Sequence, residues 1–418
     1  MRLRLRQSLP EVLPETVNVI NLFRAITCLP VCLGSIVQLF DARQAEAASP
    51  PPLQTVAPRE VGLSVERLRF IDGIVADGIE RERMPGCVVL VGRHGRIAWL
   101  RAYGSKQLQP EAVPMTTDTV FDLASLTKPI ATATSIMMLI ERGRLNLGDK
   151  VAQHIPEFGA NSKDSITIEH LLTHQAGLIP DNALRDYQDG PKLAFERIHQ
   201  LELRAQPGTS FIYSDVGFLV LGELVERLSG KPLNEYASST IFEPLGMSET
   251  MFLPGESLRL RAAVTQQRDG HWMQGEVHDP RSFELGGVAG HAGLFSTASD
   301  LAKYAQMLIN GGQLGDVRVL REETVALMQK PIKVSSGLRA LGWDVRTGYS
   351  SNRGDLLSDQ AFGHGGFTGT AIWIDPQLEL FVIFLSNRVH PDGKGSVNSL
   401  AGRIGTIAAA SIFNPPGE

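Results

Sequence analysis

Apolar residues recur at helical spacing near both ends of this 418-residue chain. Beyond Ser64, which can cap a helix, they stand three or four positions apart, at Leu68, Ile71, Val75 and Ile79. The same spacing returns between residues 396 and 413, at Val397, Leu400, Ile404 and Ile407. Both segments therefore predict amphipathic helices, each with an apolar face to bury against another layer of structure.

Strand-like apolar runs also come from both ends of the sequence. Residues 88–91 and 97–103 flank a short polar turn that contains glycine, and this arrangement predicts a β-hairpin. Residues 370–374 and 380–385 flank a turn signal that begins at Asp375. A sheet assembled from these runs would join the two ends of the chain.

These patterns define the fold class that we expect. It is an α/β (α+β) sandwich with a mainly antiparallel sheet built from both chain ends, flanked by helices, and a mostly helical lobe inserted between its strands. Residues 61–413 would form this single domain, with the α/β part at 61–145 and 340–413 and the lobe at 146–339. Within the α/β part, a continuous helix is expected at 125–144.

The first 47 residues are typical of a targeting segment. Basic residues precede an apolar stretch at 25–40, and Ala45-Glu46-Ala47 favours cleavage before Ala48. The stretch is shorter than the ~20 apolar residues of a membrane span. We therefore expect an exported protein, periplasmic or associated with the cell envelope, with a signal peptide at 1–47 and a Pro-rich linker at 48–60. An uncleaved N-terminal anchor, which would give membrane association, is the alternative.

Composition and charge further limit the class of protein and the partners that we expect. Hydrophobic residues make up 43% and charged residues 20% of the chain, which fits a soluble globular protein. The net charge of −5 gives no basic footprint, so we expect no nucleic-acid partner. Of 3 cysteines only Cys87 lies beyond the leader, where the role of a small buried hydrophobic residue is expected. These patterns carry no information on oligomeric state.

The first candidate for chemistry is the string Ser125-Leu126-Thr127-Lys128. Residues three apart lie on one face of a helix, so the Lys128 amine can reach the Ser125 hydroxyl. Serine needs an adjacent base, and a lysine shielded from water can serve because desolvation lowers its pKa. A helix start also offers free N–H groups to an oxyanion. Taken in isolation, the string is more simply interpreted as a capped helix start.

The second candidate is Tyr213-Ser214-Asp215, which stands before an expected helix at 216–228. The Tyr213 hydroxyl can carry a proton if a nearby cation lowers its pKa. Asp215 can orient Lys128 or bind a substrate amide. The structural alternative is that Asp215 caps the following helix while Tyr213 packs beneath it.

The third candidate is His364-Gly365-Gly366-Phe367, at the start of a predicted strand. Glycines let a substrate approach the backbone closely, and an N–H group at a strand edge can bind an oxyanion. The alternative is a glycine-rich strand start with an incidental histidine.

Other histidines allow a metal-site hypothesis. His278, Asp279 and His291 lie in a Gly-rich region and together offer three ligands. Hydrogen bonding within loops is the interpretation that we prefer for them. His170 and His174 have metal-ligand spacing but lack the glutamate of the metalloprotease pattern. We therefore expect no metal and no cofactor.

The three motifs, in this order, resemble the signature set of penicillin-binding proteins and serine β-lactamases. The variant Ser-x-x-Lys, Tyr-Ser-Asp and His-Gly-Gly is most similar to the class C β-lactamase branch, which also contains D-alanyl-D-alanine carboxypeptidases and esterases. Segments 170–178, 244–247 and 287–296 support the resemblance, and the pattern at 277–279 is closest to penicillin-binding protein 4B-like members. The similarity extends over residues 61–387.

The resemblance implies a role for each matching residue. Ser125 would attack a carbonyl and form an acyl-enzyme, Lys128 would ease the loss of its proton, and Tyr213 would shuttle a proton to the leaving group. Backbone N–H groups of Ser125 and Phe367 would form the oxyanion hole, and His364 would line the opposite wall. Whether Lys128 or Tyr213 is the general base stays open.

Two departures from the family pattern bear on the substrate. Asp215 replaces the usual asparagine, which removes an N–H donor and adds a charge. His364-Gly365-Gly366 lacks the lysine of Lys-Thr-Gly, and this argues against efficient β-lactam hydrolysis. We expect D-alanyl-D-alanine peptides of peptidoglycan as substrates, then small carboxylic esters, then β-lactams. A weak β-lactamase and a non-catalytic protein that binds cell-wall fragments are the alternatives.

Overall fold

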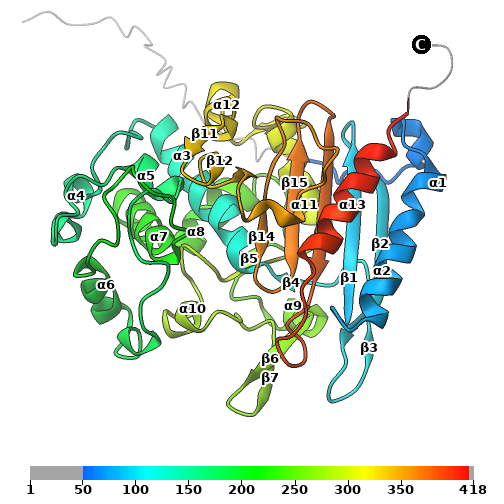
Figure 1. Cartoon of the computed structure of the whole chain (residues 1–418), viewed down its shortest axis with the longest axis horizontal. Coiled ribbons are helices and arrows are strands. Elements are labelled where there is room, and N and C mark those ends of the chain that lie inside the picture. The colour runs from blue at the N-terminus through cyan, green and yellow to red at the C-terminus, as the bar shows by residue number, and fades with distance from the viewer. Residues whose placement is uncertain (1–49, 414–418) are drawn as a thin grey trace, which may run out of the picture. The chain divides into compact units, whose positions relative to one another are not determined.

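The computed structural model describes residues 50–413, which lie within one compact unit (Figure 1). The predicted leader at 1–47 and the first two residues of the predicted linker lie outside the described residues. A search of the described helices finds none with the length and apolar character that a membrane crossing requires.

A nine-stranded sheet organises this unit, and every neighbouring pair of its strands is antiparallel. In spatial order the strands are β11 (Ile332–Val334), β12 (Gly337–Arg339), β13 (Asp344–Arg346), β14 (Phe362–Gly366), β15 (Thr370–Asp375), β16 (Leu380–Ser386), β1 (Gly86–Arg93), β2 (Arg96–Gln107) and β3 (Val113–Pro114). Because β16 pairs with β1, the sheet is built from both chain ends, and this confirms the predicted fold class.

Both predicted hairpins are present. The β1–β2 turn places His94 at φ 52° and Gly95 at φ 74°. Two successive positive φ angles match the twist of the flanking strands, and they explain the glycine in this turn. The β15–β16 hairpin closes at Asp375, whose side chain accepts backbone N–H groups from Gln377 and Leu378.

Alternate residues of the central strands face two separate cores. In β1, Val88 and Leu90 belong to one core, whereas Val89 and Val91 belong to the other. The second core is covered by α1 (Val65–Leu68), α2 (Phe70–Glu80) and α13 (Asn398–Ala410). These three helices are the predicted terminal helices, with a break at Arg69 between α1 and α2. Cys87 is buried in the same core, as predicted.

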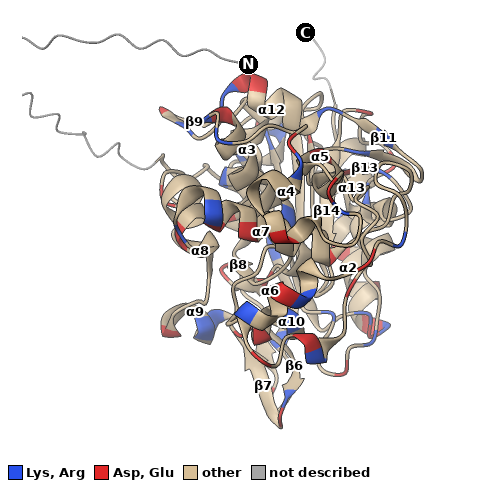
Figure 2. Cartoon of the chain, turned by 90° about the vertical axis from the view of Figure 1, so that its left-hand side faces the viewer, with Lys and Arg blue, Asp and Glu red and all other residues tan. Residues whose placement is uncertain are grey.

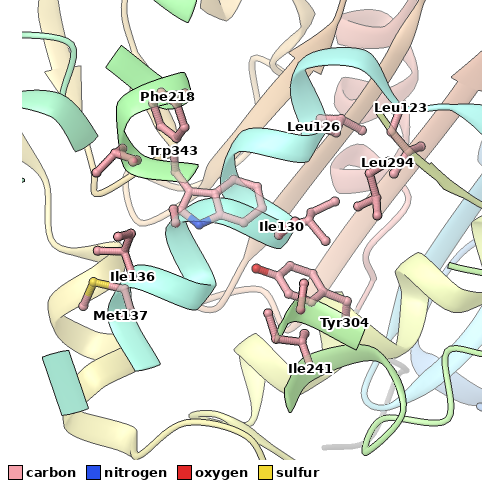
Figure 3. Packing of buried hydrophobic residues seen from close by; sticks show 14 of the residues in the cluster. Leu123, Leu126, Ile130, Ile136, Met137, Phe218, Ile241, Leu294, Tyr304 and Trp343 are labelled. Carbon is pink, nitrogen blue, oxygen red and sulfur yellow. The ribbon is translucent and has the colours of Figure 1, made fainter. Parts of the chain in front are cut away.

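The first core lies between the sheet and the inserted lobe. Figure 3 shows Trp343 between Phe218 and Ile130 in this core. The Trp343 ring stacks on Tyr304, with 6.3 Å between centroids, and meets Phe362 edge-on. The sheet and the lobe therefore share one continuous apolar contact, which fixes the position of the junction between them.

Nine α-helices lie in the described part of the chain from residue 146 to 339: α4 (Val151–His154), α5 (Ile168–Leu172), α6 (Pro191–His199), α7 (Asp215–Ser229), α8 (Leu233–Ala237), α9 (Glu256–Arg261), α10 (Pro280–Glu284), α11 (Ala298–Ile309) and α12 (Glu322–Gln329). In Figure 2, where Lys and Arg are blue and Asp and Glu are red, both colours occur in the region of α6, α7 and α10.

Short strands are more frequent here than the sequence predicts. Strand β4 (Phe121–Asp122) pairs with β8 (Leu294–Ser296), which also pairs with β5 (Met251–Phe252). Two small hairpins are formed by β6 (Val264–Arg268) with β7 (His271–Gln274), and by β9 (Gln313–Leu314) with β10 (Val317–Arg318). Strands β11 and β12 also lie within the range 146–339 that we assigned to the lobe. Pieces of two to five residues are too short to show a periodic pattern.

The helix predicted at 125–144 is not continuous, and the prediction was wrong in this respect. The segment divides into a 3₁₀ turn at Ala124–Leu126, a π-helix at Lys128–Ala133 and α3 at Thr134–Glu141. Pro129 has no N–H group to donate, and its carbonyl is bound by the Thr134 hydroxyl at 2.9 Å. Such π-helical turns widen a helix and are frequent at functional sites.

Candidate active site

Ser125 stands on a strained turn that follows β4. The preceding residue, Ala124, has φ 45°, which is unusual for a residue with a Cβ atom. The Asp122 carboxylate holds this turn because it accepts the N–H groups of Ala124 (2.8 Å) and His278 (2.6 Å). Burial raises the pKa of Asp122 to about 6 despite these bonds. Backbone strain of this kind persists only where the surroundings impose it, and here it presents Ser125 to a pocket.

The structure brings Ser125 and Lys128 together as predicted. Lys128 is fully buried, and its Nζ lies 3.0 Å from Ser125 Oγ. The same nitrogen lies 3.2 Å from the carbonyl oxygen of His291 and 2.5 Å from Asp215 Oδ1. An ammonium group has three N–H donors, and these three oxygens match them.

The ionisation of Lys128 differs from the prediction. Burial lowers its pKa, as expected, but the Asp215 carboxylate, with a smaller contribution from Tyr213, more than offsets this effect. The pKa of Lys128 therefore lies above the ordinary lysine value. The prediction of a readily deprotonated lysine was wrong, because the contact with Asp215, which the sequence analysis named as a possible partner of Lys128, favours the ammonium form.

Tyr213 lies beside this pair. Lys128 Nζ is 5.0 Å from the centre of the Tyr213 ring, which stacks on Tyr349 (5.0 Å between centroids) and lies tilted against His174 (4.4 Å). Burial raises the pKa of Tyr213, and polar contacts with Lys128 and Ser125 offset only part of that rise. The expectation that a cation lowers the pKa of Tyr213 is thus correct in sign for Lys128, but burial is the larger effect.

The start of α7 positions Asp215. Ser214 caps this helix, because its hydroxyl accepts the Gly217 N–H group at 3.2 Å. The Ser214 N–H group in turn donates to His174 Nδ1 at 3.1 Å. The alternative in which Asp215 caps the helix is therefore wrong. Asp215 occupies the first helical position, where its negative charge is favourable, and its carboxylate is free to pair with Lys128.

The third motif forms β14, next to the Ser125 turn. A Cβ atom on Gly366 would lie 2.5 Å from the carbonyl oxygen of Leu123, and one on Gly365 would lie 2.4 Å from the Asn352 amide nitrogen. The glycines thus allow β14 to approach the turn itself. His364 is buried, its Nδ1 contacts the Gly365 carbonyl at 2.8 Å, and burial holds its pKa well below the ordinary value.

These motifs meet at a pocket of about 340 Å³. Six residues predicted from the sequence line it, namely Ser125, Tyr213, His364, Gly365, Gly366 and Phe367. Lys128 and Asp215 lie behind Ser125 and do not contribute to the lining. Phe367 is 61% exposed and Tyr349 is 56% exposed, so two aromatic rings border the pocket.

The sequence analysis missed other lining residues, namely Arg339, Asp344, Tyr349, Asn352, Arg388 and Asn398. They come from short strands, loops, a 3₁₀ turn and the start of α13, and none of these segments carries a recognisable motif. The one signal in the sequence is that Arg339 and Asp344 are charged residues within the otherwise mostly apolar segment 338–345.

The metal-site hypothesis named the wrong set of residues. Within the described residues, ligand atoms of Asp215, Asp279 and His291 lie within 4.8 Å of one another. His278 instead bonds to the side-chain oxygen of Gln266 at 2.6 Å. Asp279 caps α10 and accepts a hydrogen bond from His291 at 2.9 Å. The Lys128 ammonium already pairs with Asp215, so these contacts fit the hydrogen-bonding interpretation.

An α/β fold in which helices and a helical lobe cover the two faces of one sheet, with a nucleophile of this kind at the junction of sheet and lobe, defines a serine hydrolase of the β-lactamase and penicillin-binding protein type. The chain belongs to the Beta-lactamase family, whose family model matches residues 71–405. A relative from Escherichia coli (strain K12), named "Putative D-alanyl-D-alanine carboxypeptidase", is 34% identical over 381 residues. That alignment covers 82% of this chain and 87% of the relative.

Solved structures share the fold at low sequence identity. EstCE1, described as a hydrolase with promiscuous acyltransferase activity, superposes with a TM-score of 0.65 at 24% identity and covers 84% of this chain and 99% of its own. A class C β-lactamase superposes with a TM-score of 0.68 at 17% identity, covering 83% of this chain and 97% of its own.

Proposed function

We propose that the protein hydrolyses a carboxylic amide or ester by acylation of Ser125. The observation that carries the proposal is the 3.0 Å contact between Ser125 Oγ and the buried Lys128 Nζ at the edge of a pocket. A hydroxyl held this close to a proton carrier is an activated nucleophile. The acyl group would pass from the substrate to Ser125 and then to water.

The proton of Ser125 would leave through Lys128 to Asp215. Lys128 first gives a proton to Asp215 Oδ1, 2.5 Å away, and its neutral amine then takes the proton of Ser125 as Ser125 Oγ bonds to the carbonyl carbon. When the bond to the leaving group breaks, Tyr213 protonates that group and regains a proton from Lys128, which recovers its own from Asp215. Each group is thereby restored before water attacks the acyl-enzyme.

The N–H groups of Ser125 and Phe367 would bind the oxyanion that forms on the carbonyl oxygen. Ser125 follows the strained turn, and Phe367 follows β14, which the glycines bring against that turn. Attack by water on the acyl-enzyme would use the same two donors and the same proton path in reverse.

The substrate class that we favour is a peptide ending in D-alanyl-D-alanine, as in peptidoglycan. The name of the Escherichia coli relative supports this choice. Small carboxylic esters are the second candidate, because the aromatic border formed by Phe367 and Tyr349 suits an uncharged acyl group. Action in the cell envelope would require export, and we propose that residues 1–47 serve as the signal peptide ahead of the single domain 61–413.

Labelling with two covalent probes tests the acylation of Ser125. Native protein and Ser125→Ala would each be treated with a fluorescent penicillin and, separately, with a fluorophosphonate. We expect labelling of native protein, by the penicillin if the site is peptidase-like or by the fluorophosphonate alone if it is esterase-like. Ser125→Ala should show no label with either probe. Absence of label on folded native protein, or equal labelling of the variant, would contradict the proposal.

A further inference from the structure

Two segments whose sequences resemble those of the family, 277–279 and 287–296, meet beside Lys128. The Lys128 ammonium donates to the carbonyl of His291 at 3.2 Å, and the Thr132 hydroxyl donates to the carbonyl of the preceding residue at 2.7 Å. The other two acceptors around Lys128 are side-chain oxygens, and one of them is the nucleophile. The His291 carbonyl is therefore the backbone group that holds the ammonium in place among the described residues.

The side chain of His291 ties the same segment to α10. It is 1% exposed, and its Nε2 lies 2.9 Å from Asp279 Oδ1. That oxygen also accepts the Ser282 N–H group at 2.7 Å, so the start of α10 fixes the orientation of the carboxylate. The Ser282 hydroxyl donates to the carbonyl of Ala292 at 3.1 Å. Residues 291 and 292 are thus each bound to α10 by a hydrogen bond of their own.

Two glycines explain why this segment needs such contacts. Gly290 precedes His291 and Gly293 follows Ala292, and Gly293 has φ 119°, in the region that favours glycine. A glycine leaves the backbone with more accessible conformations than any other residue does. Without the bonds to α10, the peptide group of His291 would have more freedom to turn its carbonyl away from Lys128.

The Asp279–His291 pair adjoins the catalytic cluster but lies outside the substrate pocket. Polar side-chain atoms of Asp279, His291 and Asp215 lie within 4.8 Å of one another. Neither Asp279 nor His291 belongs to the residues that line the pocket of Ser125. The pair therefore acts on the reaction through the groups that it holds.

We propose that Asp279 and His291 are positioning residues of the active site, which fix the His291 carbonyl and so direct the Lys128 ammonium toward Ser125 and Asp215. The inference rests on the proposed function, because the position of Lys128 matters only if this residue carries the proton of Ser125. Misplacement of a catalytic group by about 1 Å can slow a reaction about 100-fold. Two hydrogen bonds to a buried helix end are a means of preventing that.

The rate of labelling as a function of probe concentration tests the inference, because it separates binding from acylation. The probe is the fluorescent penicillin or, if that leaves native protein unlabelled, the fluorophosphonate. We expect Asp279→Ala and His291→Ala to lower the maximal rate on the order of 10- to 100-fold. The half-saturating concentration should not change, because neither residue lines the pocket. A native maximal rate in the folded variants, or a change confined to the half-saturating concentration, would overturn the inference.

A conservative variant separates position from charge. In Asp279→Asn the amide oxygen can still accept the N–H groups of His291 and Ser282, although the negative charge is gone. This variant should therefore keep most of the native maximal rate. A loss as large as that of Asp279→Ala would show that the charge of Asp279 matters in place of its hold on His291, and the positioning role would be wrong.

The lobe contains a matched control for the loss of a buried histidine. His199 is 4% exposed, its Nε2 lies 2.8 Å from Glu223 Oε2, and no contact joins it to Lys128 among the described residues. His199→Ala should lower stability, as His291→Ala does, but keep the native maximal rate of labelling. Equal slowing by the two substitutions would indicate a general effect of lost packing and would refute the positioning role.

A milder variant covers the case in which Asp279→Ala and His291→Ala do not fold. Ser282→Ala removes only the hydroxyl bonded to the Ala292 carbonyl, so the maximal rate should fall several-fold at an unchanged half-saturating concentration. A native rate in Ser282→Ala would count against the inference. Absence of label on native protein refutes the proposed function, whereas native rates in these variants refute the positioning role alone, so the two failures are distinguishable.

Discussion

Lys128 shows how a single neighbour decides the state of a catalytic group. Burial alone would favour the neutral amine, but Asp215 keeps the ammonium form. We therefore expect Asp215→Asn to slow acylation at neutral pH by about 100-fold, because the final proton acceptor is lost. Activity should partly recover as the pH rises through the pKa of Lys128, which loss of the Asp215 carboxylate lowers. The measurement is the rate of labelling by the fluorophosphonate as a function of pH.

A nearby carboxylate provides the control for this variant. Asp181 is 40% exposed and pairs with Arg281 at 3.7 Å, and no contact joins it to Lys128 among the described residues. Asp181→Asn removes the same charge without touching the proton path, so its pH profile should follow that of native protein. If acylation of Asp215→Asn were instead faster than that of native protein at neutral pH, Lys128 would act as a free base. The proposed proton transfer through Lys128 to Asp215 would then be wrong.

At the scale of single residues, the sequence predicts those site residues that stand close together along the chain. Ser125 and Lys128 stand three positions apart, and Tyr213 and Asp215 precede a helix, so short strings were enough to find them. Arg339 reaches the pocket only because β12 lies in the sheet, and that placement depends on pairings between distant segments. Short sequence motifs do not show which distant strands pair, so the lining residues outside the motifs were missed.

At the scale of elements, a close contact between α7 and the loop at Gly290 can be tested. A Cβ atom on Gly290 would lie 1.9 Å from the carbonyl oxygen of Phe218, a backbone atom that cannot move aside. Gly290→Ala should therefore lower the free energy of unfolding by about 3 kcal/mol. It should also slow acylation, because the next residue, His291, supplies a carbonyl to Lys128. Denaturant midpoints and labelling rates measure the two effects.

The matched control lies in α2. Gly73 is exposed, and a Cβ atom there would meet nothing within 4 Å. Gly73→Ala should therefore raise the free energy of unfolding by about 0.5 kcal/mol, because alanine loses less backbone entropy in a helix. Equal effects of the two substitutions would refute the close packing of α7 against the loop.

The contrast between predicted and unpredicted elements has a physical origin. In β1 and β16, cores on both faces of the sheet require small or apolar side chains at nearly every position, and these apolar runs are visible in the sequence. In the π-helix Lys128–Ala133, every residue is buried, so no polar face marks its period. Strands β11 to β13 have three residues each, and their place is set by the neighbouring strand more than by their own composition.

At the scale of the whole molecule, a half-buried histidine should make stability fall in acid. Burial lowers the pKa of His278 to about 4, against an ordinary value near 6.5. Between these values the unfolded chain binds a proton that the folded protein does not, so stability decreases as the pH falls through this window. His278 should account for about 2 kcal/mol of the loss between pH 7 and pH 5.

The variant His278→Gln isolates this contribution. Its free energy of unfolding, measured by denaturant titration at pH 7 and at pH 5, should fall less than that of native protein. His174 and His364, whose pKa values also lie well below the ordinary value, remain in the variant and should preserve part of the acid sensitivity. Parallel losses in variant and native protein would show that His278 is protonated equally in the folded and unfolded chain.

Strand β16 lies between β15 and β1, and this position determines when the active site can form during synthesis of the chain. On a ribosome, the hairpin β1–β2 and the turn bearing the nucleophile are made early, while their central neighbour in the sheet is still untranslated. Pairing across so long a stretch of chain is slow. For most of its synthesis, the nascent chain therefore contains Ser125 but lacks the sheet strands that complete the pocket. The active site can form only once elongation has passed residue 386.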